Sequence, residues 1–353
     1  DDVRARWAAS FGARRATPFD LLAHMGADCA GAVQVVPPGR PPDQAGELTP
    51  ISPAEIGLHI RRLRADAAAW DFPERGGRWS LGGQQGKFAL ARNGDGEWLL
   101  PSGRAASTHI VKVGVSGVPG SDVAEFVTMR AAALLGLPVP PVAFSVFDGE
   151  SALVATRFDR IVEAGGVRRV HQEDLCQALG LWRTMKYQAD GGPSAGAVID
   201  FLRRALDRRD REAGLRDFAR AQVFHWIVAG TDAHAKNHAV LHTGSLVTLA
   251  PFFALLSTAF LWPAREVHFE GRLAMKFGGE YRLRKVDAGR FDHAAAELGV
   301  DESWLIAVAR LYRDRLPDVV DAALAELPPT VAPVERARLR DAMAARLEWV
   351  CVP

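Results

Sequence analysis

Hydrophobic residues follow a strand-like pattern in much of the first half of the chain and a helical pattern in most of the second half. Between residues 78 and 113, the runs KFALAR, GEWLLP and THIVKV are short and rich in strand-forming residues, and Asn93-Gly94 favours a hairpin turn. LPVPPVAFSVF and SALVATRF predict two more strands. From about Gln172 onward the spacing predicts mainly helices, broken only by a hairpin near residues 239–249.

The N-terminal third mixes both patterns. Residues 17–36 predict a helix (Phe19 to His24), a glycine-containing turn and a buried strand, followed by the proline-rich linker VPPGRPPDQAG. Ser52 and Glu55 form a capping-box pattern at the start of a helix. The apolar stripe of this helix is Ile56, Ile60 and Leu63, and a further helix is expected over 121–136, ending at Gly136.

This order of elements is typical of an α+β fold with two lobes. We expect a β-rich N-terminal lobe over residues 1–155 and a mainly helical C-terminal lobe over residues 156–353. A length of 353 residues suits about two domains. Apolar runs long enough for a membrane span are absent from the sequence, and its start lacks the order of a signal peptide, so we expect a cytoplasmic protein.

Charge and cysteine content narrow the function classes. The 43 Lys and Arg nearly cancel the 42 Asp and Glu, which gives no argument for direct nucleic-acid binding. The arginine-rich run RRALDRRDREAGLR is more typical of a solvated helix face than of a phosphate-binding surface. The cysteines Cys29, Cys176 and Cys351 are odd in number and without CxxC spacing, which argues against a disulfide framework or a zinc ribbon.

Two segments of the first half could bind phosphate. In WSLGGQQGKFAL (79–90) the glycines and Lys87 could surround phosphates, although Leu81 and Phe88 stand where a Walker motif needs Gly and Ser or Thr. A plain turn explains this loop about as well. Lys112, near the end of THIVKV, could direct a charge into a cleft, and an exposed edge-strand lysine is the alternative.

The segment TDAHAKN after the apolar helix ending near Gly230 is the strongest candidate for catalysis. Asp232 and Asn237 have the D-x-x-x-x-N spacing of a kinase catalytic loop. In such a loop the Asp accepts the proton of the substrate hydroxyl and the Asn coordinates Mg²⁺ beside the nucleotide phosphates. Lys236, between them, could stabilise the negative charge in transfer.

Two alternatives to a catalytic loop stay open for this segment. His234, His238 and His242 are spaced by four, so they would share one face of a helix and could bind a metal ion. A hairpin directly after Asn237 would separate them, which argues against this site. The loop could also be only structural. The kinase hypothesis has its own difficulty, because TLAPFFALLSTAF (248–260) holds no second carboxylate for the metal.

Several motifs in this order resemble the HipA family of serine/threonine kinases, the toxins of HipBA toxin–antitoxin modules. The matching segments are DCAGAVQ, SLGGQQGKFAL, PSGRAASTHIVK, RFDR, VHQEDLCQALG, MKYQADGGPS, TDAHAKNHA, LAPFFALLST and LAMKFGGEYR. They span nearly the whole chain. The resemblance implies a two-lobed kinase-like fold that uses ATP and Mg²⁺, and a further N-terminal portion ahead of Asp1.

The resemblance also implies residue roles. Asp232 matches the catalytic base and Asn237 a magnesium ligand. The residues expected near the nucleotide are Lys87, Lys112, Gln172, His234 and Phe158, the last beside adenine in the hinge RFDR. Thr156 replaces the usual hinge glutamate, and Ser80 matches the serine that family members autophosphorylate to expel the Gly-rich loop.

The most consequential departure is Ala254, which stands where the family has the metal-binding Asp. An engineered inactivation and a natural pseudokinase both explain it. The resemblance otherwise implies an ATP-dependent toxin kinase that phosphorylates an aminoacyl-tRNA synthetase, glutamyl-tRNA synthetase above all. A HipB-like helix-turn-helix antitoxin is the implied partner, and any DNA contact is made through it. The alternative function is a catalytically dead module that binds nucleotide or antitoxin.

Overall fold

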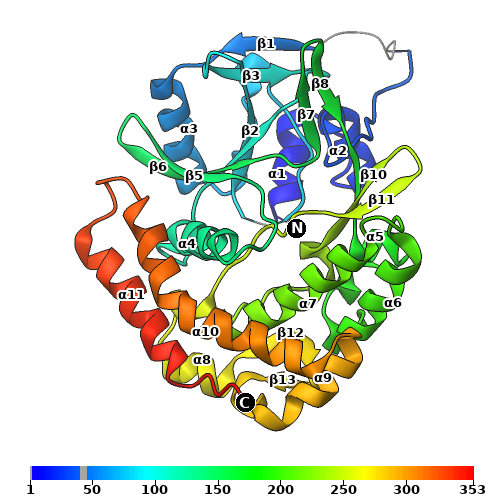
Figure 1. Ribbon diagram of the computed structural model, residues 1–353. Helices are drawn as coiled ribbons and strands as arrows, with labels where there is room; N and C mark the ends of the chain where they lie inside the picture. The colour runs from blue at the N-terminus through cyan, green and yellow to red at the C-terminus, as the bar shows by residue number, and fades with distance from the viewer. Residues whose placement is uncertain (1, 40–45, 84) are drawn as a thin grey trace. The chain divides into compact units, whose positions relative to one another are not determined.

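The computed structural model describes residues 2–39, 46–83 and 85–353, and the chain forms two compact units (Figure 1). The first unit is Asp1–Asp122 with Pro141–Gln172, and the second is Val123–Pro140 with Glu173–Pro353. Most of the predicted proline-rich linker, residues 40–45, lies outside the described residues. The α+β class is confirmed, and the domain boundary expected at 155/156 stays a prediction.

An antiparallel six-stranded sheet in the order β1-β3-β2-β4-β6-β5 organises the first unit. Its strands are β1 Glu47–Pro50, β2 Lys87–Arg92, β3 Trp98–Ser102, β4 His109–Lys112, β5 Val142–Phe147 and β6 Glu150–Thr156. The predicted hairpin joins β2 to β3. Asn93 closes it, because its side-chain oxygen accepts hydrogen bonds from the backbone N–H groups of Asp95 and Glu97 at 3.1 and 2.8 Å.

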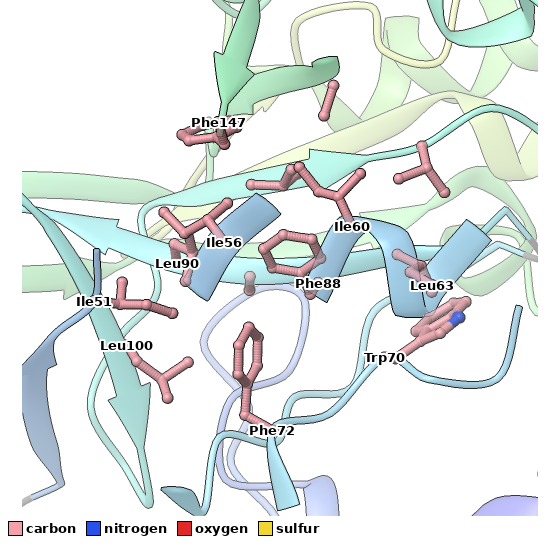
Figure 2. Close-up of a cluster of buried hydrophobic side chains, with 14 of the residues drawn as sticks. Ile51, Ile56, Ile60, Leu63, Trp70, Phe72, Phe88, Leu90, Leu100 and Phe147 are labelled. Carbon is pink, nitrogen blue, oxygen red and sulfur yellow. The ribbon is translucent and has the colours of Figure 1, made fainter. Parts of the chain in front are cut away.

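Helix α3 (Pro53–Ala65) packs on this sheet. The capping box is confirmed: the Glu55 N–H donates to the Ser52 hydroxyl, and the Ser52 N–H donates to the Glu55 carboxylate at 2.8 Å. The predicted stripe is fully buried and lies beside Phe88 and Leu90 of β2 (Figure 2). Burial of each large apolar side chain stabilises the fold by about 1.5–3 kcal/mol.

The remaining elements of the first unit correct two expectations. This unit also contains helices α1 (Asp2–Phe11) and α2 (Pro18–Met25), and α2 includes the helix predicted from Phe19 to His24. The prediction of a buried strand before residue 36 is wrong. Cys29 makes an isolated bridge with Ser80 there, and residues 33–37 are irregular and not buried. A second hairpin, β7 (Arg160–Glu163) with β8 (Gly166–Arg169), was not predicted.

Helices dominate the second unit. They are α4 Ser121–Leu134, which begins in the first unit, α5 Leu175–Ala178, α6 Ala195–Ala205, α7 Arg211–Val228, α8 Ala264–Glu270, α9 Phe291–Leu298, α10 Glu302–Ala325 and α11 Pro333–Leu347. Short 3₁₀ turns are η1 Pro73–Arg75 in the first unit and η2 Arg183–Met185, η3 Gln188–Asp190, η4 Ala235–Asn237, η5 Thr258–Phe260, η6 Leu283–Lys285 and η7 Ala288–Arg290 in the second. No helix in the described ranges is long and apolar enough to cross a membrane.

The strands of the helical half show one confirmed and one missed hairpin. β10 (Ala239–Thr243) and β11 (Leu246–Leu249) form the predicted hairpin, in the sheet order β11-β10-β9 with β9 (His171–Asp174). The expectation that this hairpin alone interrupts the helices is wrong, because β12 (Arg272–Phe277) pairs with β13 (Glu280–Arg282). Gly278 and Gly279 turn between them with φ of 55° and 81°, values that glycine adopts readily.

A buried network of charges holds DCAGAVQ against RFDR within the first unit. Asp28 accepts hydrogen bonds from Ser107 at 2.5 Å and from Arg160 at 2.9 Å. Arg157 binds both carboxylate oxygens of Asp159 at 2.9 and 2.7 Å. Burial alone would raise the pKa of the Asp28 carboxyl, but the neighbouring arginines outweigh it and hold that pKa below its ordinary value. Arg160 also donates to the backbone oxygens of Cys29 and Gly31 at 2.8 and 2.9 Å, so side chains rather than a neighbouring strand bind these carbonyls.

We expect Asp28→Ala to lower the free energy of unfolding of the first unit by about 3–5 kcal/mol, because it leaves buried arginines without their carboxylate. Glu163→Ala is the matched control. Its pair with Arg168 is about half exposed, so its loss should cost less than about 1 kcal/mol. Urea denaturation followed by tryptophan fluorescence measures both. Equal losses for the two variants would contradict a structural role for the network.

His59, on α3, gives the core a pH dependence. It is 2% exposed and stacks on Phe72 with ring centroids 3.7 Å apart, and burial lowers its pKa to about 4. The native state therefore excludes a proton that the unfolded chain binds below pH 6.5. The contribution of neutral His59 to stability is fully present above pH 6.5 and is lost as the pH falls toward 4.

Between pH 6.5 and pH 4, we expect His59 to lower the free energy of unfolding by about 1.4 kcal/mol for each pH unit of acidification. His59→Leu should remove this part of the slope. His293→Gln, at an exposed histidine, should leave it unchanged. Urea midpoints at pH 7 and pH 5 provide the measurement, and an unaltered slope in His59→Leu would overturn the assignment.

Candidate active site

The candidate catalytic loop begins at a strained residue where α7 ends. Ala229 is left-handed, with φ of 56°, which costs a non-glycine residue about 1–2 kcal/mol. Gly230, expected as the helix stop, is the following residue. A Cβ there would lie 2.6 Å from Nδ1 of His225, so only glycine fits without a shift. The turn directs the chain out of the helix toward Asp232.

Carbonyl groups at the end of α7 receive hydrogen bonds from distant residues. Helices leave their last carbonyls without intrahelical partners. Here Ser257 Oγ donates to Val228 O at 2.5 Å, and Thr258 Oγ1 donates to Ala229 O at 2.7 Å. Arg346 of α11 donates to Trp226 O at 2.8 Å. A cation is favourable at a helix C-terminus, and burial lowers the pKa of Arg346 only to about 10, so it stays charged at neutral pH.

Asp232 and Asn237 lie on the same tight turn, as their spacing predicts. The Asn237 amide Nδ2 donates to the backbone oxygen of Asp232 at 2.7 Å. The His234 N–H donates to that oxygen at 2.8 Å. The Asp232 side chain is 55% exposed, which leaves its carboxylate accessible to a substrate. With its amide nitrogen occupied, Asn237 presents its side-chain oxygen as an acceptor.

Two further side chains contact the Asp232 carboxylate. The Tyr187 hydroxyl donates a hydrogen bond to Oδ1, and Nε2 of His234 lies 3.7 Å from the same oxygen. Burial and the hydrogen bond to Asp232 raise the pKa of Tyr187. Burial lowers the pKa of His234 despite the nearby carboxylate, so its imidazole is neutral at pH 7. Sequence reasoning assigned no role to Tyr187, although MKYQADGGPS was a recognisable motif.

Lys236 pairs with Asp174 rather than with Asp232. Asp174 caps α5, where it accepts a hydrogen bond from the Gln177 N–H at 3.0 Å. The Leu175 N–H donates to His238 O at 3.0 Å, so the loop is fastened to α5 at two points. The expected role of Lys236 in transfer stays a prediction.

The three histidines of the loop have separate environments. His234 lies beside Asp232, buried His238 packs against Phe218 and Phe252, and His242 pairs with Glu173 at 2.9 Å. They do not share a helix face, because η4 and β10 separate them. Across the described residues, His, Cys, Asp and Glu form no group of three or more that could hold a metal ion.

The segment that carries Ala254 runs alongside the catalytic loop. At one end the Ala250 N–H donates to Ala239 O at 2.9 Å, and at the other the Thr258 N–H donates to Ala229 O at 3.1 Å. Residues 229–239 and 250–258 are therefore joined at both ends. Ala254 is itself left-handed, with φ of 54°, a conformation in which Asp and Asn are enriched. Its methyl group offers no ligand.

The lysines expected to contact phosphate are direct neighbours in the first unit. Lys87 of β2 and Lys112 of β4 are antiparallel register partners, so their side chains leave the same face of the sheet. Lys87 is buried, and its Nζ donates to Gly82 O at 2.6 Å and lies 4.7 Å from the Trp70 ring centroid. Two ammonium groups on one face of neighbouring strands are suited to bind one anion together.

The other predicted residues of the first unit attach to the buried charge network. The Ser80 N–H donates to Asp28 O at 2.9 Å. Phe158, partly exposed, lies in the chain between two members of the network, Arg157 and Asp159. Gln172 follows the hairpin β7–β8, and Gly31 approaches its backbone so closely that a Cβ would lie 2.8 Å from Gln172 N. Ser80 and Phe158 are thus next to members of the network, and Gln172 lies against Gly31, whose N–H donates to Asp159 at 2.6 Å.

Comparisons with known proteins show which family the chain resembles in sequence. The family model described as HipA-like C-terminal domain matches residues 79–324, and the HipA N-terminal domain model matches residues 1–36. Y4mE of Sinorhizobium fredii, named as a kinase, is 34% identical over 339 residues, covering 90% of this chain and 77% of its own. The serine/threonine-protein kinase toxin HipA of Shewanella oneidensis is 30% identical over 332 residues, covering 91% and 74%.

A solved structure extends the similarity to the fold. HipA of Shewanella oneidensis, in a complex with HipB and operator DNA, superposes with a TM-score of 0.80 at 27% identity. The match covers 99% of this chain and 80% of that one. Family models over most of the chain, a relative above 30% identity and the shared α+β fold agree with each other. The chain belongs to the HipA family of kinases.

Proposed function

We propose that this chain is built as an ATP-dependent serine/threonine kinase toxin, with Asp232 as its catalytic base, and that Ala254 impairs it. The observation that carries the proposal is the turn in which Asn237 holds Asp232 while the carboxylate stays 55% exposed. A base must reach the proton that it removes, and an exposed carboxylate on a rigid turn meets that need. Asp232 would accept the proton of a Ser or Thr hydroxyl as the phosphoryl group transfers to its oxygen.

The nucleotide-binding part of the proposal rests on charge. Lys87 and Lys112 project from the same face of neighbouring strands, so both ammonium groups could bind the triphosphate of ATP. The Gly-rich loop before Lys87 adds backbone N–H donors. We assign further contacts to Phe158, Gln172 and His234, with Phe158 against the adenine ring. These assignments follow from the family and remain proposals.

The proposed site offers few oxygen ligands for Mg²⁺. Mg²⁺ needs near-octahedral oxygen ligands and usually takes one or two carboxylates. Asn237 offers one neutral oxygen, and the side chain at Ala254 offers none. The donors in the segment 250–258 therefore do not fit a magnesium site as they stand. This observation favours the second candidate function, a module that binds nucleotide or partner without turnover.

Substrate and partner are proposed from the relatives. The HipA of Shewanella oneidensis was solved with HipB and operator DNA, so we propose a HipB-like helix-turn-helix antitoxin as partner, through which DNA contact is indirect. The proposed protein substrate is an aminoacyl-tRNA synthetase. Ser80 is the proposed autophosphorylation site. Its N–H donates to the backbone oxygen of Asp28, so a phosphate there would add about two negative charges near the buried charge network.

Ala254→Asp is expected to restore phosphoryl transfer, because it supplies the missing carboxylate at a backbone position that suits Asp. We expect incorporation from radiolabelled ATP into Ser80 or a lysate protein to rise on the order of 10²-fold, in a magnesium-dependent manner. Ala254→Asn is the matched control, because it suits the same backbone without adding charge. Transfer that stays at background in Ala254→Asp would refute the lost-ligand explanation, and phosphoproteomics on cells expressing it would identify the substrate.

Calorimetric titration with ATP separates the two candidate functions in the chain as it stands. For an impaired kinase we expect ATP affinity to increase when Ala254→Asp and Mg²⁺ are combined, since the added carboxylate completes the metal site. Tight ATP binding that is indifferent to Mg²⁺ in both forms would favour the binding module. Absence of binding in every form would contradict both functions.

A further inference from the structure

The motif MKYQADGGPS (185–194) forms a compact turn whose function is not yet assigned. The Tyr187 carbonyl accepts hydrogen bonds from the N–H groups of Asp190 and Gly192, at 3.0 and 2.9 Å. Gly191 is left-handed, with φ of 91°. A Cβ on Gly192 would lie 2.7 Å from Tyr187 O and closer still to Met185 O, so glycine is required. The two glycines allow the turn to close around Tyr187.

This turn is fastened both to the catalytic loop and to β12. The Ala235 N–H of the loop donates to Lys186 O at 3.0 Å. On the other side the Gln188 side-chain oxygen accepts a hydrogen bond from the Lys276 N–H at 2.7 Å. The Tyr187 ring meets His234 edge-on, with ring centroids 5.0 Å apart. The hydroxyl of Tyr187 is thereby held at Oδ1 of Asp232.

We propose that Tyr187 is a positioning residue that holds the Asp232 carboxylate in one orientation, with Oδ1 occupied and Oδ2 directed to the substrate hydroxyl. The inference rests on the proposed function of Asp232 as base. A carboxylate that is 55% exposed can rotate about its last bond unless a donor fixes one oxygen. In the part of the chain that the structure describes, the contacts of this carboxylate, Tyr187 and His234, both lie at Oδ1.

The chemistry of the phenol suits a fixed donor. Burial and the neighbouring carboxylate raise the pKa of Tyr187, so the hydroxyl keeps its proton at neutral pH and can only donate to Asp232. A base that is oriented by a third group is the usual arrangement in proton-transfer sites. The competing idea, that the phenol occupies the place of the substrate hydroxyl, predicts the opposite kinetic effect.

The kinetic test uses the full chain with Ala254→Asp and compares Tyr187→Phe with Tyr281→Phe. Phe at 187 keeps the ring contact with His234 and removes only the hydroxyl. Tyr281 is a matched control, because its ring contacts Arg272 and Lys276 and not the base. We expect the rate of transfer from radiolabelled ATP to fall about tenfold in Tyr187→Phe, with the Kd for ATP unchanged within about twofold. Tyr281→Phe should change neither. An unchanged or higher rate in Tyr187→Phe would overturn the proposal.

A double-mutant cycle, read out by Tm, tests the same contact without an activity measurement. We expect Tyr187→Phe to lower Tm by about 2 °C when Asp232 is present and to have no effect in the Asp232→Ala chain, where the acceptor is gone. Equal shifts in both chains would show that Tyr187 does not hold Asp232. If Ala254→Asp transfers no phosphoryl group, the proposed function fails, and the cycle still decides the inference about Tyr187.

Discussion

The candidate active site depends on how the C-terminal end of α7 is satisfied. A buried helix end with open carbonyls is unfavourable, and a left-handed Ala229 adds strain, yet the chain must turn there to form the loop. Ser257, Thr258 and Arg346 supply donors to three of the last carbonyls. These hydrogen bonds make the strained turn the stable conformation, and the direction of Asp232 follows from it.

The same hydrogen bonds position the segment that carries Ala254. Ser257 and Thr258 belong to that segment, and the Ser257 N–H is itself held by Thr128 of α4 at 3.1 Å. The loop and the segment 250–258 are therefore held together. Ala254 has the left-handed backbone conformation that suits Asp. Under the proposed function, the missing carboxylate at 254 would remove a metal ligand without changing this backbone.

Local patterns were predictable from the sequence, and distant partners were not. The capping box at Ser52, the Asn93 hairpin and the Asp232–Asn237 turn each depend on neighbours within a few residues. Tyr187 bonds Asp232 over 45 residues and Arg346 bonds Trp226 of α7 over 120, so no spacing could indicate them. The strand expected before residue 36 failed for the same reason. Its apolar pattern was correct locally, but the buried Arg157 and Arg160 donate to the backbone oxygens of Cys29 and Gly31.

The positions of charged side chains in the two units bear on the proposed function. In the second unit Lys236 pairs with Asp174 and not with Asp232, and the Asp232 side chain is 55% exposed. In the first unit, Lys87 and Lys112 lie side by side on the same face of the sheet. Under the proposed function, the two lysines beside the Gly-rich loop would bind the phosphates and the exposed Asp232 carboxylate would act as the base, while Ala254 would leave the metal without its carboxylate.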